Sequence, residues 1–371
     1  MKYYIIAGEA SGDLHGSNLM KAILAKDPTA EIRFWGGDLM QNVGGTLVKH
    51  YRDLAFMGFA EVIMNLRTIL GNISVCKKDI LQFQPDTLIY IDYPGFNMRI
   101  AKWAKKLGIL NQYYISPQIW AWKENRIKDI KRDMDKMYVI LPFEKDFYEK
   151  KHNFSVEFVG HPLIDAISNR DKTSFEKFTS ENKLSQKPII ALLPGSRKQE
   201  IEKMLSIMLS VVDKFSDYQF VIAGAPSQEY DFYKQFLTTE NVNFVSNKTY
   251  DLLSVSHAAL VTSGTATLET ALFKVPQIVC YKANRISYEI AKRIITLKFI
   301  SLVNLIMDKE VVKELIQKEL NSKNLESELN KIISGNQRQE MLSQYEILEQ
   351  KLGGKGASEK TADLILNAIK K

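Results

Sequence analysis

The sequence predicts an α/β protein built from two doubly wound domains. Short apolar runs rich in β-branched and aromatic residues alternate with longer helical patterns, which is typical of a parallel sheet covered by helices. This alternation begins again after residues 169–187, a polar stretch that contains four Lys and one Arg. The length of 371 residues suits two domains, since globular domains hold roughly 150 residues each.

Both halves of the chain follow the same order of strands and helices. In the first half we expect strands at 3–7, 31–35, 87–91, 112–115 and 137–141, and helices at about 13–26, 101–106 and 126–132. In the second half we expect strands at 188–193, 219–223, 242–244, 258–261 and 277–281, and helices at about 200–215, 229–237 and 267–273. The tail, 310–371, is predicted to be helical with breaks at 335–336 and 353–354.

We therefore expect one domain over residues 1–165 and another over 166–344. The last helix, 345–371, is expected to pack back on the first domain. Two doubly wound domains in tandem usually bind a ligand in the cleft between them, at the carboxyl ends of their strands.

Composition excludes several classes of protein. Hydrophobic residues make up 45% and charged residues 25% of the chain, so disordered, collagen-like and coiled-coil proteins are excluded. Two cysteines cannot form a disulfide framework, which favours a reducing compartment. The N-terminus does not resemble a signal peptide, and no window of about 18 apolar residues predicts a membrane-spanning helix.

The charge of the chain favours anionic partners. Lys and Arg number 50 against 43 Asp and Glu, which gives a net charge of +7. Acidic residues interrupt the basic run at 126–132, so we expect no nucleic acid partner. The five histidines show no metal-ligand spacing, and neither a G-x-S-x-G nor a G-x-x-x-x-G-K-[ST] motif occurs, so no metal or cofactor is expected.

The first loop with candidate chemistry follows the strand at 3–7. It contains Glu9, Gly12, Asp13 and His15 at the start of a helix, where glycines admit a ligand and the helix N-terminus favours anions. Its spacing is not that of the dinucleotide-binding fingerprint. An ordinary tight turn between strand and helix is the alternative.

A second candidate, Asp92, follows the strand at 87–91. Pro94 and Gly95 are expected to fix a turn that holds its carboxylate at the carboxyl end of the strand, where a general base must be kept within reach of its proton. A turn or helix-capping aspartate is the alternative.

Two loops of the second half suit a nucleoside diphosphate. Ser196 is expected to cap the next helix with Gln199 as its partner, and the Arg197 guanidinium suits a diphosphate. The other loop, with Ser263, Gly264 and Thr265, leaves room for a phosphate, and Glu269 can accept hydrogen bonds from ribose hydroxyls. A plain capped helix and an ordinary first-turn acid are the alternatives.

Two segments combine apolar and basic residues. The stretch 54–64 includes Phe56, Met57 and Phe59, and the tryptophans Trp120 and Trp122 precede a run with four basic side chains. Such a mixture suits a membrane interface. Burial in the core is the alternative, and for 56–64 alone it is favoured.

Taken in order, these segments resemble a known family, the lipid-A-disaccharide synthases, over nearly the whole chain. Each segment is weakly specific by itself, but their common order is strong evidence. The matching segments are AGEASGD (7–13), MG (57–58), DYPGFN (92–97), YISPQIWAW (114–122), LPFE (141–144), GH (160–161), LPGSR (193–197) and SGTATLE (263–269).

The resemblance implies a GT-B glycosyltransferase with two Rossmann-like domains that face a central cleft. It implies inverting transfer of 2,3-diacylglucosamine from UDP-2,3-diacylglucosamine to 2,3-diacylglucosamine 1-phosphate (lipid X), which gives the β-1,6-linked lipid A disaccharide 1-phosphate and UDP. It implies no metal.

Site residues carry over position by position. Asp92 matches the family's essential aspartate, the leading candidate for general base on the acceptor 6-hydroxyl, with His15 as a rival base. Glu9 matches the acid of the first loop, and Arg197 the arginine near the diphosphate. The chain departs from many members at Gly95, where they carry an acid. The resemblance assigns to the nucleotide site Ser263, Gly264, Thr265, Glu269, Tyr281 and Asn304. We also expect Gly12 and Ser196, from the loops described above, to bind the UDP-sugar.

Acylated substrates imply contact with a membrane. We therefore expect a cytoplasmic enzyme bound peripherally to the inner face of the bacterial inner membrane, through Phe56, Met57, Phe59, Trp120 and Trp122, and a homodimer is left open. The alternatives are a UDP-N-acetylglucosamine 2-epimerase or another UDP-GlcNAc-dependent GT-B enzyme. A binding protein without enzymatic activity has only the net charge in its favour.

Overall fold

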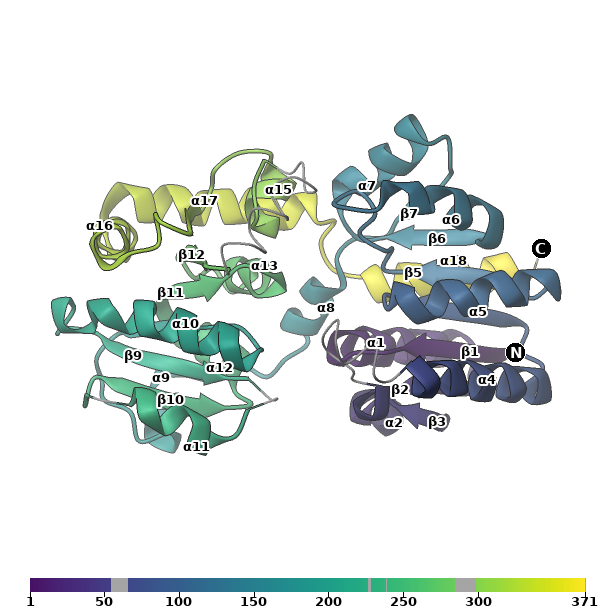
Figure 1. The fold of residues 1–371 in the computed structure, drawn as a ribbon, viewed down its shortest axis with the longest axis horizontal. Helices are drawn as coiled ribbons and strands as arrows, with labels where there is room; N and C mark the ends of the chain where they lie inside the picture. Colours follow the sequence, from purple (N-terminus) through teal and green to yellow (C-terminus); the bar gives the residue numbers. More distant parts are fainter. Residues whose placement is uncertain (55–65, 226–227, 238, 284–297, 371) are drawn as a thin grey trace. The chain divides into compact units, whose positions relative to one another are not determined.

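The computed structural model describes residues 1–371 except 55–65, 226–227, 238, 284–297 and 371 (Figure 1). The chain forms two compact units, one of Met1–Ser168 with Leu352–Lys371, the other of Asn169–Lys351. The expected boundaries, 165/166 and 344/345, lie a few residues before these. Each unit contains one parallel sheet, which gives the α/β class that the sequence predicts.

The sheet of the first unit has seven strands. The strand order changes direction between β1 and β4, which defines a switch point of the doubly wound kind. In spatial order the strands are β3 (Thr46–His50), β2 (Glu31–Gly36), β1 (Lys2–Ala7), β4 (Thr87–Ile91), β5 (Leu110–Tyr114), β6 (Lys136–Val139) and β7 (Glu157–Phe158).

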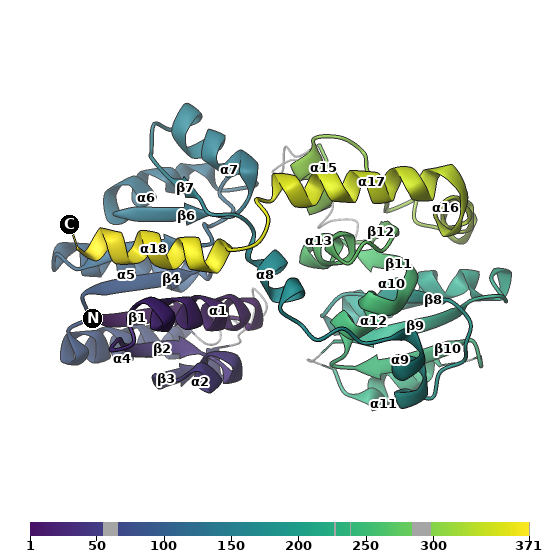
Figure 2. The ribbon, with the colours of Figure 1, turned by 180° about the vertical axis from the view of Figure 1, so that it is seen from behind.

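Helices cover both faces of this sheet. Figure 1 shows α4 and α5 in front of it, and Figure 2 shows α1 and α18 on the opposite face. The helices of the unit are α1 (Ala10–Lys26), α2 (Asp38–Val43), η1 (Tyr51–Leu54), α4 (Leu66–Phe83), α5 (Pro94–Lys106), η2 (Glu124–Arg126), α6 (Ile127–Asp133), α7 (Pro142–Asp146), η3 (Phe147–Lys151), α8 (Pro162–Ser168) and α18 (Ala357–Ile369).

The sheet of the second unit has six strands and its switch point lies between β8 and β11. In spatial order they are β10 (Val242–Ser246), β9 (Gln219–Gly224), β8 (Ile189–Leu193), β11 (Ser256–Thr262), β12 (Gln277–Tyr281) and β13 (Lys313–Ile316). The helices are α9 (Phe175–Glu181), α10 (Lys198–Met208), η4 (Leu209–Lys214), α11 (Tyr230–Tyr233), η5 (Lys234–Phe236), α12 (Thr249–Val255), α13 (Thr265–Leu272), α15 (Leu302–Met307), α16 (Ser322–Ile333) and α17 (Gly335–Lys351).

The central strands form because their side chains are apolar on both faces. Every residue of β4, β8 and β9 is buried, as expected for parallel strands between two layers of helices. The unbroken apolar runs that predicted these strands are the same residues that fill the cores.

The sequence-based expectations fail mainly at the sheet edges and the tail. The strands β3, β7 and β13 were not expected, and β13 lies in the tail that was predicted to be helical. Its sequence, KELI, carries charged residues that an edge strand tolerates, and backbone pairing with β12 overrides local helix propensity. The expected helices 200–215 and 229–237 each end in a 3₁₀ segment, η4 and η5.

The last helix, α18, returns to the first unit and packs on α1. The Asp165 carboxylate accepts hydrogen bonds from the backbone N–H groups of Gly356 (2.7 Å) and Ser358 (3.0 Å) at the start of α18. Gly353, at a φ of +89°, lies so close to the Gly160 backbone that a Cβ would be 3.0 Å from its Cα. A capped helix start and a tight glycine contact therefore fix where the chain re-enters the unit.

Replacing Asp165 by alanine should lower the free energy of unfolding by about 1–3 kcal/mol, because one buried and one partly buried backbone N–H group lose their acceptor. Urea denaturation followed by circular dichroism measures this. Asp363→Ala is the control, since its exposed ion pair with Lys26 should contribute less than about 1 kcal/mol. Equal losses for the two variants would contradict the capping role.

Candidate active site

In the first unit, Asp92 occupies a strained position directly after β4. Asp92 and Tyr93 both adopt the left-handed conformation, with φ of +44° and +50°. The Asp92 carbonyl oxygen accepts hydrogen bonds from Asn97 Nδ2 (2.7 Å) and Tyr113 Oη (2.6 Å), which hold this conformation. The turn is thus made by Asp92 and Tyr93. The expected turn at Pro94 is wrong, because Pro94 opens α5, where its fixed φ suits the first helical turn.

The environment of Asp92 makes its carboxylate a stronger base than usual. Burial first, and the negative charge of Glu9 second, raise the pKa of Asp92 to about 6 against the opposing effect of a hydrogen bond from the Tyr93 backbone. A carboxylate with a pKa near neutrality accepts a proton well at physiological pH. Glu9 itself is exposed at the start of α1, so the first-loop acid acts on Asp92 electrostatically.

Close packing explains two glycines of the first loop, Gly8 and Gly12. A Cβ on Gly8 would stand 2.3 Å from the Tyr93 ring, so only glycine lets that ring lie over the loop. A Cβ on Gly12 would lie 3.1 Å from the Ala7 Cβ, which brings α1 close to β1. Gly12, predicted to bind the UDP-sugar, is buried in this helix–strand contact.

His15 is a weaker candidate base than Asp92. Its side chain is only 7% exposed and burial lowers its pKa to about 4. The negative charge of Asp165 opposes this decrease, and His15 in turn lowers the pKa of the buried His161. Within the described residues its Nδ1 has no hydrogen-bond partner. An enclosed imidazole with a lowered pKa is a weak base and is poorly placed to meet a substrate hydroxyl.

Asp13, part of the motif that favoured function, has a structural task. Its carboxylate accepts from the backbone N–H groups of Gly37 (2.8 Å), Leu39 (3.1 Å) and Met40 (3.0 Å) at the start of α2. It is buried and fully engaged there. The first loop therefore contributes Glu9 to the region of Asp92, and Asp13 to the fold.

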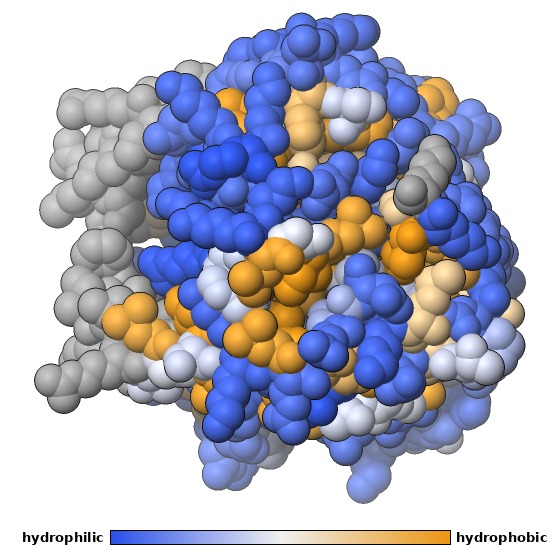
Figure 3. All heavy atoms as spheres, turned by 90° about the vertical axis from the view of Figure 1, so that its right-hand side faces the viewer, coloured by the Kyte–Doolittle hydropathy of each residue, from blue (hydrophilic) through white to orange (hydrophobic). Residues whose placement is uncertain are grey.

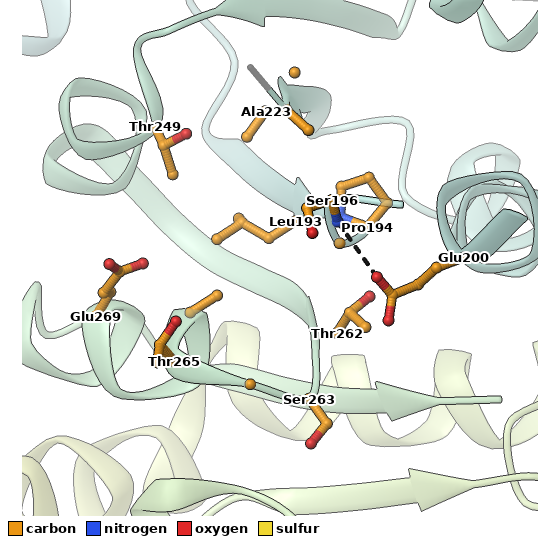
Figure 4. Close-up of a pocket in the computed structure, with 15 residues that line it drawn as sticks. Leu193, Pro194, Ser196, Glu200, Ala223, Thr249, Thr262, Ser263, Thr265 and Glu269 are labelled. Carbon is orange, nitrogen blue, oxygen red and sulfur yellow. Dashed lines mark hydrogen bonds between the residues drawn. The ribbon is translucent and has the colours of Figure 1, made fainter. Parts of the chain in front are cut away.

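In the second unit, a pocket lies where β8, β9 and β11 end, at the switch point of the sheet (Figure 4). Gly195 and Gly264 adopt φ of +103° and +151°, conformations that favour glycine. The residues lining it are Leu193, Pro194, Gly195, Ser196, Glu200, Ala223, Gly224, Ala225, Thr249, Thr262, Ser263, Gly264, Thr265, Ala266 and Glu269. Five of these, Ser196, Ser263, Gly264, Thr265 and Glu269, were predicted to bind the UDP-sugar.

Glu200 was not predicted and contributes a carboxylate to this pocket. Its Oε2 accepts a hydrogen bond from the Ser196 backbone N–H (3.3 Å), drawn in Figure 4, and it stands where a Gly195 Cβ would be. The expected capping box of Ser196 with Gln199 is wrong, because α10 begins at Lys198 and Arg197 is its N-cap residue. Arg197 is exposed and is not among the described residues that line the pocket.

The opposite side of the pocket carries hydroxyl groups and a second acid. Ser263 Oγ donates to the Ile300 carbonyl (2.9 Å), while the buried Thr262 Oγ1 has no partner among the described residues. Glu269 accepts a hydrogen bond from Tyr250 Oη at 2.7 Å, and burial raises its pKa. A carboxylate acceptor and several hydroxyls around loops with glycine can form hydrogen bonds with a polar ligand.

The Asn304 side chain takes part in a buried hydrogen-bond network, and its role in UDP-sugar binding stays a prediction. Its Nδ2 donates to the Val312 carbonyl (2.8 Å) and Glu314 Oε1 (2.9 Å), and its Oδ1 accepts from the Val311 and Val312 backbones (2.7 and 3.0 Å). The amide is fully buried, so it holds α15 against the segment before β13. Tyr281, at the end of β12, is also outside the described lining of the pocket.

The two predicted membrane tryptophans differ in exposure. Trp120 Nε1 donates to Glu144 Oε1 (3.2 Å), a buried carboxylate that Ser116 Oγ also binds, so Trp120 is tied to the unit's interior. Trp122 is 48% exposed, and Lys123 Nζ lies 4.1 Å from its ring centroid. Phe56, Met57 and Phe59 lie outside the described residues.

The surface of the first unit carries further apolar side chains. Figure 3 shows apolar areas on one face, separated by hydrophilic residues. Among the described residues no helix is long and apolar enough to span a membrane. In the same residues, no group of three or more His, Cys, Asp or Glu is placed to hold a metal ion. The exposed large apolar residues of this unit include Leu39, Leu70, Val75, Leu81, Leu107 and Trp122.

Solved structures define the class. The UDP-bound MnaA of Staphylococcus aureus has a TM-score of 0.68 at 15% identity and covers 100% of this chain and 98% of its own. The calicheamicin glycosyltransferase CalG4 has a TM-score of 0.60 at 13% identity, covering 99% and 97%. The fold is thus that of GT-B glycosyltransferases and UDP-GlcNAc 2-epimerases, as expected.

Sequence relatives decide between these groups. The family model described as lipid-A-disaccharide synthetase matches residues 3–368. The lipid-A-disaccharide synthase of Syntrophus aciditrophicus is 39% identical and covers 99% of this chain and 97% of its own. That of Geobacter metallireducens is 37% identical with the same coverage, and that of Coxiella burnetii is 36% identical, covering 98% of each.

The chain belongs to the lipid-A-disaccharide synthase family. It is therefore a glycosyltransferase of lipid A biosynthesis, which confirms the resemblance and the activity predicted from the sequence. The epimerase alternative is not favoured, because the epimerases share the fold at only 12–15% identity.

Replacing Glu9 by glutamine should lower the pKa of Asp92 below about 6, because a negative charge that disfavours its ionised form is removed. A ¹³C NMR titration of carboxyl groups, with the Asp92 signal assigned from Asp92→Asn, measures this. Glu31→Gln is the control, since Glu31 lies at the amino end of β2, whereas Asp92 follows the carboxyl end of the parallel strand β4. An unchanged Asp92 titration in Glu9→Gln would refute the electrostatic coupling.

Proposed function

We propose that the chain transfers 2,3-diacylglucosamine from its UDP derivative to the 6-hydroxyl of 2,3-diacylglucosamine 1-phosphate, with inversion. The products are the β-1,6-linked disaccharide 1-phosphate and UDP. The observation that carries this proposal is Asp92 itself. Asn97 and Tyr113 hold its backbone carbonyl after β4, and burial and Glu9 give its carboxylate a pKa of about 6.

Asp92 is proposed as the general base. Its carboxylate takes the proton of the acceptor hydroxyl while that oxygen forms a bond to the anomeric carbon of the donor. The bond from this carbon to the UDP oxygen breaks at the same time, and UDP leaves with the electron pair. Attack opposite the leaving group inverts the anomeric configuration. Because Asp92 is partly buried, it is ionised above pH 6 and still a good proton acceptor.

The pocket of the second unit is proposed as the site of the UDP group. The backbone N–H groups at the start of α13 and the hydroxyls of Ser263 and Thr265 suit the diphosphate. Glu269 suits the ribose hydroxyls as an acceptor. Arg197 remains a candidate for the diphosphate, since its long side chain starts beside the pocket loop. Such donors stabilise the charge that develops on UDP as it leaves.

Peripheral binding to an anionic membrane is the second part of the proposal. Both substrates carry acyl chains, so the enzyme has to reach them at a lipid surface. The exposed Trp122 ring, with Lys123 Nζ at 4.1 Å and the Arg126 guanidinium at 6.0 Å, combines an interfacial aromatic with cations for lipid headgroups. The cytoplasmic face of the inner membrane is the proposed location.

Replacing Asp92 by asparagine should lower the rate of disaccharide formation by about 10²–10⁴-fold, because the amide cannot accept the proton. UDP binding should not change, because the residues lining the nucleotide pocket belong to the second unit. Mass spectrometry of products formed in detergent, with isothermal calorimetry of UDP, measures both. Asp146→Asn is the control, since Asp146 is exposed and pairs with Lys150.

Disaccharide formation at the wild-type rate by Asp92→Asn would move the base to His15 or Glu9. A well-folded wild-type protein that makes no disaccharide would refute the proposed reaction, and epimerisation of UDP-N-acetylglucosamine would then be tested.

Vesicle binding should increase with the fraction of anionic lipid, and Lys123→Gln with Arg126→Gln should weaken it, at about 1 kcal/mol for each charge near the surface. Co-sedimentation with phosphatidylcholine vesicles containing increasing phosphatidylglycerol measures this. Ile347→Ala, an exposed apolar position in the second unit, is the control. Binding that does not depend on anionic lipid would contradict the electrostatic part of the proposal.

A further inference from the structure

A tyrosine outside the pocket lining contacts the acid inside it. Tyr250 on α12 donates a hydrogen bond from Oη to Glu269 Oε1 on α13, at 2.7 Å. In the part of the chain that the structure describes, this is the one hydrogen bond that the Glu269 side chain makes. Tyr250 is itself adjacent to the pocket residue Thr249.

Tyr250 is held in place by its own neighbours. Its ring lies 5.3 Å from the Phe273 ring, centroid to centroid, and the Arg170 guanidinium stands 5.2 Å from its centroid. Arg170 in turn pairs with Asp251 at 2.6 Å. A ring packed in this way keeps its hydroxyl in one position. The hydrogen bond from that hydroxyl therefore fixes the orientation of the Glu269 carboxylate.

The hydrogen bond from Tyr250 leaves the Glu269 carboxylate able to accept further hydrogen bonds from two neighbouring hydroxyl groups. One oxygen of Glu269 is occupied by a donor, and the other is available to hydroxyl groups that enter the pocket. Burial raises the pKa of Glu269, whereas the hydrogen bond from Tyr250 counteracts that rise and favours the ionised form. An ionised carboxylate only accepts hydrogen bonds, which is what two neighbouring ribose hydroxyls require.

We infer that Tyr250 is a positioning residue that orients Glu269 toward the ribose hydroxyls of the uridine nucleotide. The inference rests on the proposed function, since it takes the pocket to be the UDP site. It adds that recognition of the ribose depends on a residue that need not touch the ligand. The contribution of Tyr250 to binding should therefore be seen only with ligands that carry the 2′- and 3′-hydroxyls.

The test compares UDP with 2′,3′-dideoxy-UDP, which lacks both ribose hydroxyls. Isothermal calorimetry on the full-length protein gives the dissociation constant of each ligand for wild type and for Tyr250→Phe. We expect wild type to bind UDP more tightly than the dideoxy analogue. Tyr250→Phe should weaken UDP binding by about tenfold, the loss of roughly one well-placed hydrogen bond, and leave binding of the dideoxy analogue unchanged.

Two further variants make the result specific. Glu269→Gln should lose the same preference for UDP, and adding Tyr250→Phe to it should cause no further loss, because both changes act on one contact. Tyr230→Phe is the matched control, since Tyr230 is an exposed tyrosine of the same unit that lies outside the described pocket lining. It should bind both ligands as wild type does.

The possible failures are distinguishable. If Tyr250→Phe weakened the binding of UDP and of dideoxy-UDP equally, or did not weaken UDP binding, the positioning role would be overturned. The assignment of the pocket as the UDP site would not be affected. A folded wild-type protein that does not bind UDP would overturn the proposed function, and the inference with it.

Discussion

Parallel strand pairing is the constraint on which both candidate sites depend. In a parallel sheet the carboxyl ends of all strands lie on the same side. Where the connections of two neighbouring strands lead to opposite faces of the sheet, a crevice forms between their carboxyl ends. In the first unit this happens between β1 and β4, and it brings the Glu9 loop to Asp92. In the second it happens between β8 and β11, and it brings the Gly195 loop to the Gly264 loop.

The carboxylates of the chain fall into two groups by what they accept. Asp13, Asp165 and Glu144 each accept hydrogen bonds from two or more backbone N–H groups, and each thereby fixes the start of a helix or a bend. Asp92 and Glu269 are partly buried, and among the described residues few donors meet them. Burial raises the pKa of both, as it does that of Glu144, so the scarcity of donors is what sets these two apart. A buried carboxylate with few protein partners is costly to the fold, which is why such groups mark sites of function.

The sequence was informative where local chemistry decides structure. The buried strands β4 and β12 were predicted with the bounds that the structure gives, because unbroken apolar runs admit few other structures. Asp92 became a candidate from its place after β4, with a turn aspartate as the alternative, and the family resemblance made it the leading candidate for the base. The role of Asp13 could not be foreseen, since its partners lie about 25 residues away on α2. The strand β13 was missed for the same reason, because its backbone pairing with β12 decides its structure.

Tyr250 shows a different limit of sequence reasoning. Nothing in its neighbourhood distinguishes it from a core aromatic, and only the folded contact with Glu269 gives it a role. Glu200 is similar, because its carboxylate reaches the pocket by folding back on the Gly195 loop from the first turn of α10. Residues that act through another residue leave no motif, whereas residues that meet a ligand at the end of a strand do.

The pH dependence of kcat/KM for disaccharide formation tests the central claim, that Asp92 is the general base, most directly. A base is active when deprotonated, and the pKa of Asp92 is raised to about 6, so the rate should fall as the pH drops through about 6 and level off above it. The residual activity of Asp92→Asn should lack this acidic limb. A rate that stays flat from pH 5 to 8 in the wild type, or a limb that persists in Asp92→Asn, would contradict the account.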